Sequence, residues 1–119
     1  MEETTALVNA IIEGVQEKKG TEISVVDLSK MEGAICQRFV ICQGNSPSQV
    51  EAIADAVEEF GRKKAGEKPA KVIGRENAIW VAMDYGTVMV HIFVPDARTY
   101  YDLDHLWEDA PVTLIPNVE

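Results

Sequence analysis

The acidic side chains of this sequence are its first candidates for chemistry. A magnesium-dependent transfer centre needs two or three carboxylates side by side. The Asp102 and Asp104 pair lies in a segment predicted as helix, where residues two apart diverge by about 200° and cannot chelate one ion. Asp27, Asp84 and Asp96 fall at the ends of predicted strands, but only that location supports a metal site. We therefore predict no metal site.

The sequence also lacks the residue patterns of nucleophilic catalysis and of phosphate binding. His91 lies on a predicted strand and His105 in a predicted helix, and neither has a Ser or Cys at a diagnostic spacing. The Gly-Asn-Ser turn at residues 44–46 lacks the Lys and further glycines of a phosphate loop. Cys36 and Cys42 are typical of small buried hydrophobic residues. We predict no catalytic residue and no cofactor.

Residues 77–109 are organised around a predicted β-hairpin, because two apolar runs flank a polar break that contains Gly86. A two-residue turn at Tyr85 and Gly86 pairs Trp80 with His91, and alternation sorts the side chains onto two faces. The apolar face, predicted as core, carries Ile79, Val81, Met83, Val88, Val90 and Ile92. The mixed face carries Trp80, Ala82, Asp84, Thr87, Met89 and His91.

The mixed face has two interpretations. An aromatic anchor and a Met among polar groups are typical of protein-contact surfaces. Alternatively, a helix covers this face, Trp80 is ordinary core and His91 is a hydrogen-bonded structural histidine rather than a contact or a pH sensor. Taken alone, the residues favour the second interpretation.

Periodicity elsewhere predicts three helices and the rest of one sheet. The helices cover residues 4–19, a segment that begins with Ser46 as N-cap, and residues 97–107. Pro47 is the expected first residue of the second helix and Gln49 the expected capping-box partner, with the helix fading near residues 61–66. The strands outside the hairpin are expected at residues 22–28, 36–43 and 71–74, and residues 111–119 as a short tail.

These elements predict a single α/β domain over residues 1–119, with about five strands in a mixed sheet and three helices packed on it. The central apolar run at residues 39–42 is typical of a strand buried on both faces. The acidic N-terminus is unlike a targeting segment, and no apolar run approaches the roughly 18 to 20 residues that span a bilayer. We therefore expect a soluble, cytoplasmic protein with no membrane contact.

The formal net charge of −9 disfavours a nucleic-acid binder and suits a basic protein partner. Residues 61–75 are the exception, with six basic groups against Glu67. Such a band is usually a solvated helix end, and its other interpretation is contact with a nearby phosphate backbone.

A series of spaced residues resembles the ribosomal silencing factor family, also called the Iojap family. The resemblance extends over about residues 4–110 and includes the strand at residues 39–41 and the turn at residues 44–46. Its most specific part is the series Trp80, Asp84-Tyr85-Gly86, Val90-His91-Ile92-Phe93, Arg98, Tyr100-Tyr101, Leu103 and Leu106-Trp107.

This resemblance implies a translation repressor and not an enzyme. Such a factor binds the large ribosomal subunit through its ribosomal protein fourteen and sterically blocks joining of the small subunit when nutrients are scarce. The implied fold has a nucleotidyltransferase-like core without catalytic carboxylates. The resemblance also allows a homodimer of the free protein. A nucleotide-binding or nucleotidyltransferase-like enzyme is the alternative function.

The resemblance also places the partner contacts. Trp80 and Tyr85 are expected as apolar anchors, Asp84 as an acceptor for a partner Lys or Arg, and Arg98 as an internal brace for the turn. A minor contact with ribosomal RNA is expected through Arg62, Lys63 and Lys64. The full set of expected contact residues is Trp80, Ala82, Met83, Asp84, Tyr85, Met89, His91, Arg98, Tyr100 and Tyr101.

Overall fold

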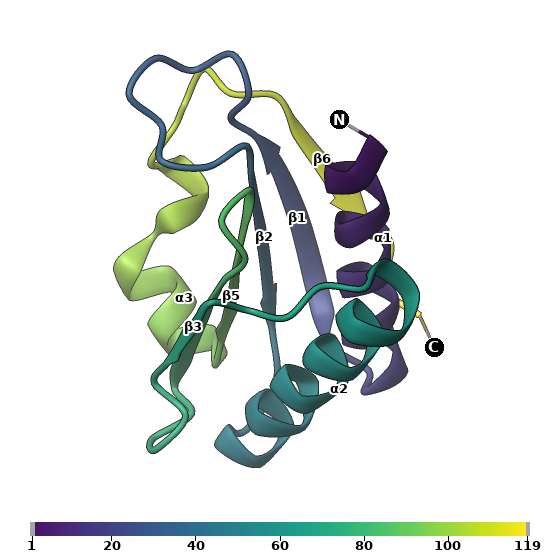
Figure 1. Ribbon diagram of the computed structural model, residues 1–119. Helices are drawn as coiled ribbons and strands as arrows, with labels where there is room; N and C mark the ends of the chain where they lie inside the picture. Colours follow the sequence, from purple (N-terminus) through teal and green to yellow (C-terminus); the bar gives the residue numbers. More distant parts are fainter. Residues whose placement is uncertain (1, 119) are drawn as a thin grey trace.

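A computed structural model describes residues 2–118, whose strands form one six-stranded mixed sheet with helices on both faces (Figure 1). The strand order is β3-β4-β5-β2-β1-β6, and among these strands only β2 and β5 run parallel. Along the chain the elements are α1 (Glu2–Glu17), β1 (Thr21–Asp27), β2 (Arg38–Gln43), α2 (Pro47–Ala65), β3 (Lys71–Ile73), β4 (Trp80–Asp84), β5 (Val88–Phe93), α3 (Pro95–Tyr101), the 3-10 turn η1 (Leu103–His105) and β6 (Val112–Ile115).

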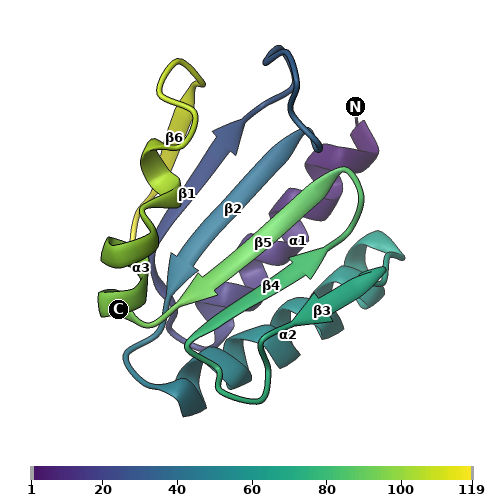
Figure 2. The ribbon, with the colours of Figure 1, turned by 90° about the vertical axis from the view of Figure 1, so that its left-hand side faces the viewer.

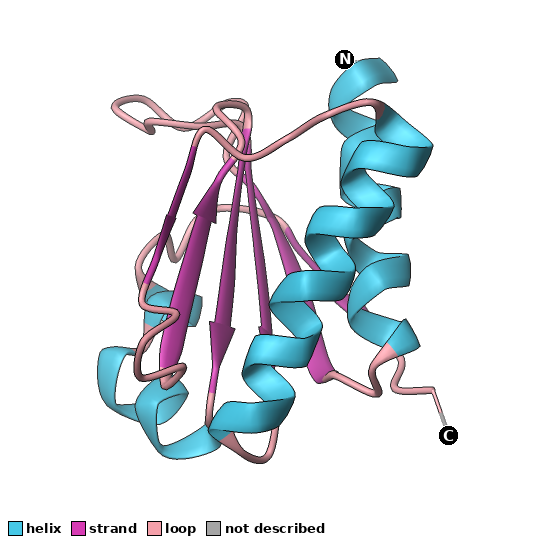
Figure 3. Cartoon of the chain, turned by 60° about the horizontal axis from the view of Figure 1, so that its bottom comes forward, coloured by secondary structure: helices cyan, strands magenta, loops and turns pink. Residues whose placement is uncertain are grey.

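The larger core lies between the sheet and the two long helices. Helices α1 and α2 pack side by side on one face of the sheet, and α3 lies on the other (Figure 3). The two long helices approach closely, since a Cβ on Gly14 would lie 2.8 Å from the carbonyl oxygen of Ala56. The predicted central strand is confirmed, because Val40, Ile41 and Cys42 are fully buried.

The start of α2 follows from a few local residues, and its prediction is confirmed. Ser46 is the N-cap, and its Oγ accepts a hydrogen bond from the Gln49 backbone N–H at 3.1 Å. The Gln49 side chain accepts in return from the backbone N–H of Asn45 at 2.7 Å, so the reciprocal bond reaches the residue before the cap. The helix ends at Ala65, with Gly66 in the left-handed conformation.

The predicted hairpin register was wrong by two residues. Trp80 pairs with Phe93 and Ala82 pairs with His91, and the backbone N–H of Tyr85 donates to Val88 O at 2.9 Å. The two-residue turn is therefore at residues 86–87, which places Gly86, with φ +86°, at the first central position of a type II′ turn. A shift of two residues leaves both faces of the hairpin unchanged.

Most expected boundaries are within two residues of those observed, and three differences from the prediction are larger or change the role of a residue. The third helix ends at Tyr101 rather than at residue 107, because Asp102 adopts a left-handed conformation with φ +53°. Residues 112–115 of the predicted tail form β6, which pairs antiparallel with β1. Ile79, expected in the core, precedes β4 and is exposed.

Candidate protein-contact face

The second face of the sheet is only partly covered. α3 and the segments around it cover a small core that includes Val26, Phe39 and Phe93. Figure 2 looks onto this side, where β3, β4 and β5 have no helix in front of them. The side chains on or beside the uncovered part, called here the open face, are Lys71, Ile73, Trp80, Ala82, Asp84, Met89, Tyr100 and Tyr101.

Aromatic rings form the centre of the open face. The half-buried Trp80 stacks on Phe93, with ring centroids 5.1 Å apart, and contacts Tyr101 at 4.6 Å. Tyr100, which is 81% exposed, meets Tyr101 edge-on at 5.0 Å. Offset and edge-to-face contacts of this kind favour the observed arrangement of the rings by about 0.5–1.5 kcal/mol per pair. The face therefore presents a preorganised aromatic surface.

His91 supports this surface from within. Its side chain is only 4% exposed, and its Nδ1 accepts a hydrogen bond from the Trp80 indole N–H at 3.1 Å. Burial lowers the pKa of His91 to about 4, so the ring is neutral near pH 7 and carries its proton on Nε2. The Phe39 ring lies against it at 4.8 Å. This geometry favours the structural interpretation of His91 over a direct contact.

Two of the expected contact residues point away from the open face and into the core. Met83 is fully buried, and Tyr85 is 8% exposed in the core beneath α2. The Tyr85 hydroxyl lies beside Gly61, where an added Cβ would be 3.3 Å away, and burial raises the pKa of Tyr85 to about 12. The expectation of an exposed Tyr85 anchor is therefore corrected. Strand alternation places residues 83 and 85 on the same side, opposite Asp84.

Asp84 is half-buried at the end of β4. Its Oδ1 accepts from the Gly86 backbone N–H at 2.8 Å and so stabilises the turn. No hydrogen bond from the described residues to its second carboxylate oxygen is observed. Asp84 can therefore serve the turn and a partner cation at once.

Arg98 is a brace, but not for the hairpin turn. Its Nε and Nη2 donate to the Asp104 carboxylate at 3.0 and 2.8 Å, and Nη2 also donates to Ser24 Oγ at 3.1 Å. Nη1 donates to the backbone oxygen of Glu22 and to Gln43 Oε1. These bonds hold the pKa of Asp104 below its usual value. Arg98 thereby ties the α3 region to β1 and β2.

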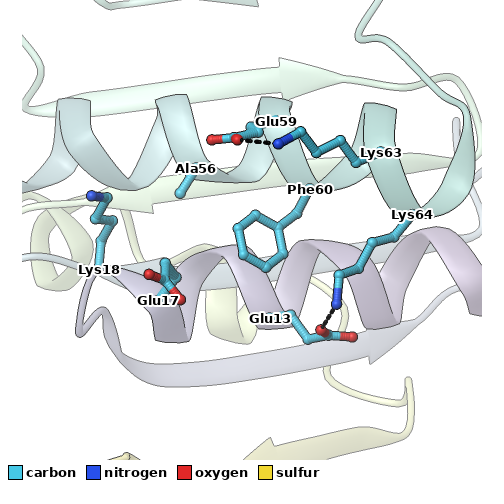
Figure 4. A pocket seen from close by; sticks show the side chains of 8 residues that line it. All are labelled: Glu13, Glu17, Lys18, Ala56, Glu59, Phe60, Lys63 and Lys64. Atoms are coloured by element: carbon cyan, nitrogen blue, oxygen red, sulfur yellow. Dashed lines mark hydrogen bonds and ion pairs between the residues drawn. The ribbon is translucent and has the colours of Figure 1, made fainter.

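The basic residues at the end of α2 lie in the helical layer, on the other side of the sheet. Lys63 pairs with Glu59 at 2.8 Å, and Lys64 pairs with Glu13 at 2.5 Å (Figure 4). They border a hollow of about 630 Å³ between α1 and α2. Each of these lysines has a carboxylate partner at the surface, and Arg62 is exposed beside them.

Among residues 2–118, no group of three His, Cys, Asp or Glu side chains is placed to hold a metal ion. Burial raises the pKa of Cys42 to about 12, which keeps this thiol protonated and unreactive. None of the helices in this range is long and apolar enough to cross a membrane.

Comparison with known sequences decides the family. The model of the family described as "Ribosomal silencing factor during starvation" matches residues 1–119. The chain belongs to this family. Ribosomal silencing factors are non-enzymatic, so the nucleotidyltransferase-like alternative is set aside. The resemblance noted in the sequence is confirmed.

Relatives and solved structures agree with this membership. The chain is 35% identical over 112 residues to ribosomal silencing factor RsfS of Halalkalibacterium halodurans, covering 94% of each chain. It is 40% identical over 98 residues to RsfS of Bacillus subtilis, covering 81% of this chain and 80% of the relative. A crystal structure of a Chromobacterium violaceum protein superposes with a TM-score of 0.81 at 31% identity, covering 97% of this chain and 95% of the other.

One member of the open face, Ile73, was missed in the sequence. It is 55% exposed on β3, and its pairing with Ala82 puts it on the same side as Trp80. The sequence did predict a short strand there, but the side that Ile73 faces depends on pairing with β4. Local periodicity carries no information about that pairing.

Proposed function

We propose that this chain binds the large ribosomal subunit through ribosomal protein fourteen and blocks joining of the small subunit, lowering translation under nutrient limitation. Membership of the ribosomal silencing factor family supports a role at the ribosome. The observation that carries the choice of docking surface is the aromatic group of Trp80, Tyr100 and Tyr101 on an uncovered part of the sheet.

The composition of the open face suits a protein partner. Trp and Tyr dominate the binding energy of protein interfaces because they bury large areas and lose little side-chain entropy. Here Trp80 is already held by Phe93 and His91, so docking would order few additional rotamers. The side chains that remain available as contacts are Ile73, Trp80, Ala82, Asp84, Met89, Tyr100 and Tyr101.

The net charge of the chain favours a basic partner, and Asp84 is a candidate contact for a cation of that partner. With a net charge of −9, the chain attracts basic proteins and repels exposed phosphates. Asp84 is half-exposed on the open face, at the other end of β4 from Trp80, and is the proposed acceptor for a partner Lys or Arg. The proposed minor contact with ribosomal RNA then depends mainly on Arg62, since Lys63 and Lys64 have carboxylate partners.

The proposed mechanism is steric and involves no covalent step. The molecule measures 35 × 33 × 28 Å, which is large enough to separate two surfaces that must touch. Binding of this chain and joining of the small subunit then compete for the same surface of the large subunit, so excess small subunits should reverse the block. The proposed site of action is the cytoplasm. A free homodimer that used the open face would have to dissociate before docking.

Calorimetry with isolated ribosomal protein fourteen tests whether this protein is the binding partner. Saturable binding is expected, with Tyr100→Glu weakening it at least about tenfold because an exposed ring is replaced by a charge. Leu114→Glu is the matched control, since Leu114 is similarly exposed but lies on β6, and it should bind like the unaltered chain. No binding by the unaltered chain, or equal binding by both variants, would contradict the proposal.

A further inference from the structure

The loop between β1 and β2, residues 28–37, adjoins one end of the open face. Its base is hydrogen-bonded to the hairpin turn, because the backbone N–H of Gln37 donates to Thr87 O at 2.8 Å. The loop rises beyond the strand ends and projects to the side of the sheet on which α3 lies (Figure 1). It therefore lies at the turn end of the open face, near Asp84 and away from Trp80.

The loop and the hairpin turn form one continuous surface. A hollow of about 290 Å³ between them is lined by Ile35 from the loop and by Gly86 and Thr87 from the turn. Burial, with a smaller contribution from the nearby Asp84 charge, raises the pKa of the Cys36 thiol in the loop. The open face thus continues past Asp84 onto the loop.

Ile35 is the apolar side chain that this loop presents to solvent. It is 80% exposed, and among the large hydrophobic side chains of the described residues only Tyr100, at 81%, is more exposed. The residues on either side of it are held, because Cys36 is buried and Ala34 packs against the small core. The backbone N–H of Ala34 also donates to Met31 O at 3.3 Å. Ile35 is therefore fixed pointing outward.

The size of a protein interface requires more surface than the open face offers. A stable interface covers about 800 Å² on each partner, which is a patch roughly 30 Å across. The distance along β4 from Trp80 to Asp84 is only about 13 Å, at 3.3 Å per residue. Tyr100 and Tyr101 of α3 extend the surface at the Trp80 end. At the Asp84 end, the loop extends it on the same side of the sheet.

We infer that the basic protein docked on the open face also covers the loop at residues 28–37, with Ile35 as a second apolar anchor at the opposite end of the interface from Tyr100. This inference rests on the proposed function and adds a contact region to it. Because the loop is already held by hydrogen bonds and by packing, covering Ile35 orders little additional chain.

Continuity and charge select this occupant. A partner cation at Asp84 places the adjoining partner surface over the hollow that Ile35 lines. The exposed Lys30 and Glu32 leave the loop without net charge, so it neither attracts a phosphate backbone nor repels a basic protein. A second copy of this chain would instead bring a net charge of −9 towards Asp84.

Isoleucine methyl signals of the full chain, measured by NMR, test the extent of the interface. The chain is deuterated except at these methyl groups, and the proton signals of bound ribosomal protein fourteen are saturated. We expect signal loss at Ile35 on the loop and at Ile73 on the open face, and none at Ile12, which is half-buried on α1 across the sheet. Loss at Ile73 with Ile35 unchanged would overturn this inference alone. Loss at neither would overturn the proposed docking face as well.

A pair of variants measures the contribution of Ile35. Ile35→Lys removes the apolar anchor and adds a charge of the partner's sign, so calorimetry should show binding weakened at least about tenfold. Leu114→Lys, similarly exposed on β6, should bind like the unaltered chain, and both variants should unfold at its temperature. Equal binding by the two variants would overturn the inference. So would a concentration-dependent loss of the Ile35 signal in the chain alone, which would assign the loop to self-association.

Discussion

The indole N–H of Trp80 donates to Nδ1 of His91 at 3.1 Å, from β4 to the neighbouring β5. The bond needs an unprotonated Nδ1, and so it couples the Trp80 ring of the open face to the charge of a buried histidine. Protonating His91 would place two donors face to face and bury a charge. The shape of the open face should therefore depend on pH.

Acid should destabilise the fold through His91. Its pKa is lowered to about 4 from 6.5, so its contribution to stability is fully present above pH 6.5 and is lost as pH falls through 4. The shift corresponds to a loss of roughly 3 kcal/mol in the free energy of unfolding. Urea unfolding between pH 7 and pH 4 measures it.

The control for this pH dependence is the exposed His105, whose pKa is raised by its hydrogen bond to Asp102. That pairing stabilises the fold below pH 6.5, and the stabilisation is lost as pH rises through the folded pKa of His105. The pH dependence from His105 therefore has the opposite sign to that from His91. His105→Gln should therefore keep the acid loss, whereas His91→Phe should flatten it. An unchanged acid profile in His91→Phe would refute the assignment.

Replacing Arg98 should destabilise the protein far more than replacing a surface arginine. Arg98→Met leaves Asp104, Ser24 and the Glu22 carbonyl without their shared donor, and we expect a loss of about 3 kcal/mol. Arg98→Lys should recover little, because an ammonium group cannot reproduce the planar contacts. Thermal or urea unfolding is the measurement.

Arg75 supplies the comparison for Arg98. It pairs with Asp55 and lies near Glu51 and Glu58 on the surface of α2, where solvent screens the charges. Arg75→Met should cost less than about 1 kcal/mol. A similar cost for the two methionine variants would show that Arg98 is not the brace described here.

Gly14 should reject a side chain although it lies within a helix. Alanine favours helix by about 1 kcal/mol over glycine, but its Cβ would lie 2.8 Å from the backbone oxygen of Ala56. We expect Gly14→Ala to destabilise the fold by roughly 2 kcal/mol, since overpacking moves α1 away from α2. Asn9→Ala, at an exposed position of the same helix, should be neutral or stabilising, and the same result for Gly14→Ala would contradict the close crossing.

The parts of the fold that the sequence predicted are those decided by neighbouring residues. Ser46, Pro47 and Gln49 determine the start of α2 within one turn of helix. The two faces of the hairpin were also predicted, because alternation survives a register error of two residues. The turn itself was misplaced by one residue, since Gly86 suits either central position of a two-residue turn.

The parts that the sequence did not predict depend on distant partners. β6 is four residues long and is defined by pairing with β1, some ninety residues earlier in the chain. Arg98 was expected to brace the hairpin turn, but its partners Ser24 and Glu22 lie on β1. Ile73 joins the open face only through pairing with β4. None of these relationships leaves a local pattern.

The most direct test of the proposed function is the joining of purified ribosomal subunits followed by light scattering while the chain is added. We predict that the chain lowers the final scattering in proportion to its concentration, that excess small subunits restore it, and that Tyr100→Glu abolishes the effect while Leu114→Glu retains it. Scattering unchanged by the chain at saturation of the large subunit, or inhibition that excess small subunits cannot reverse, would contradict the account.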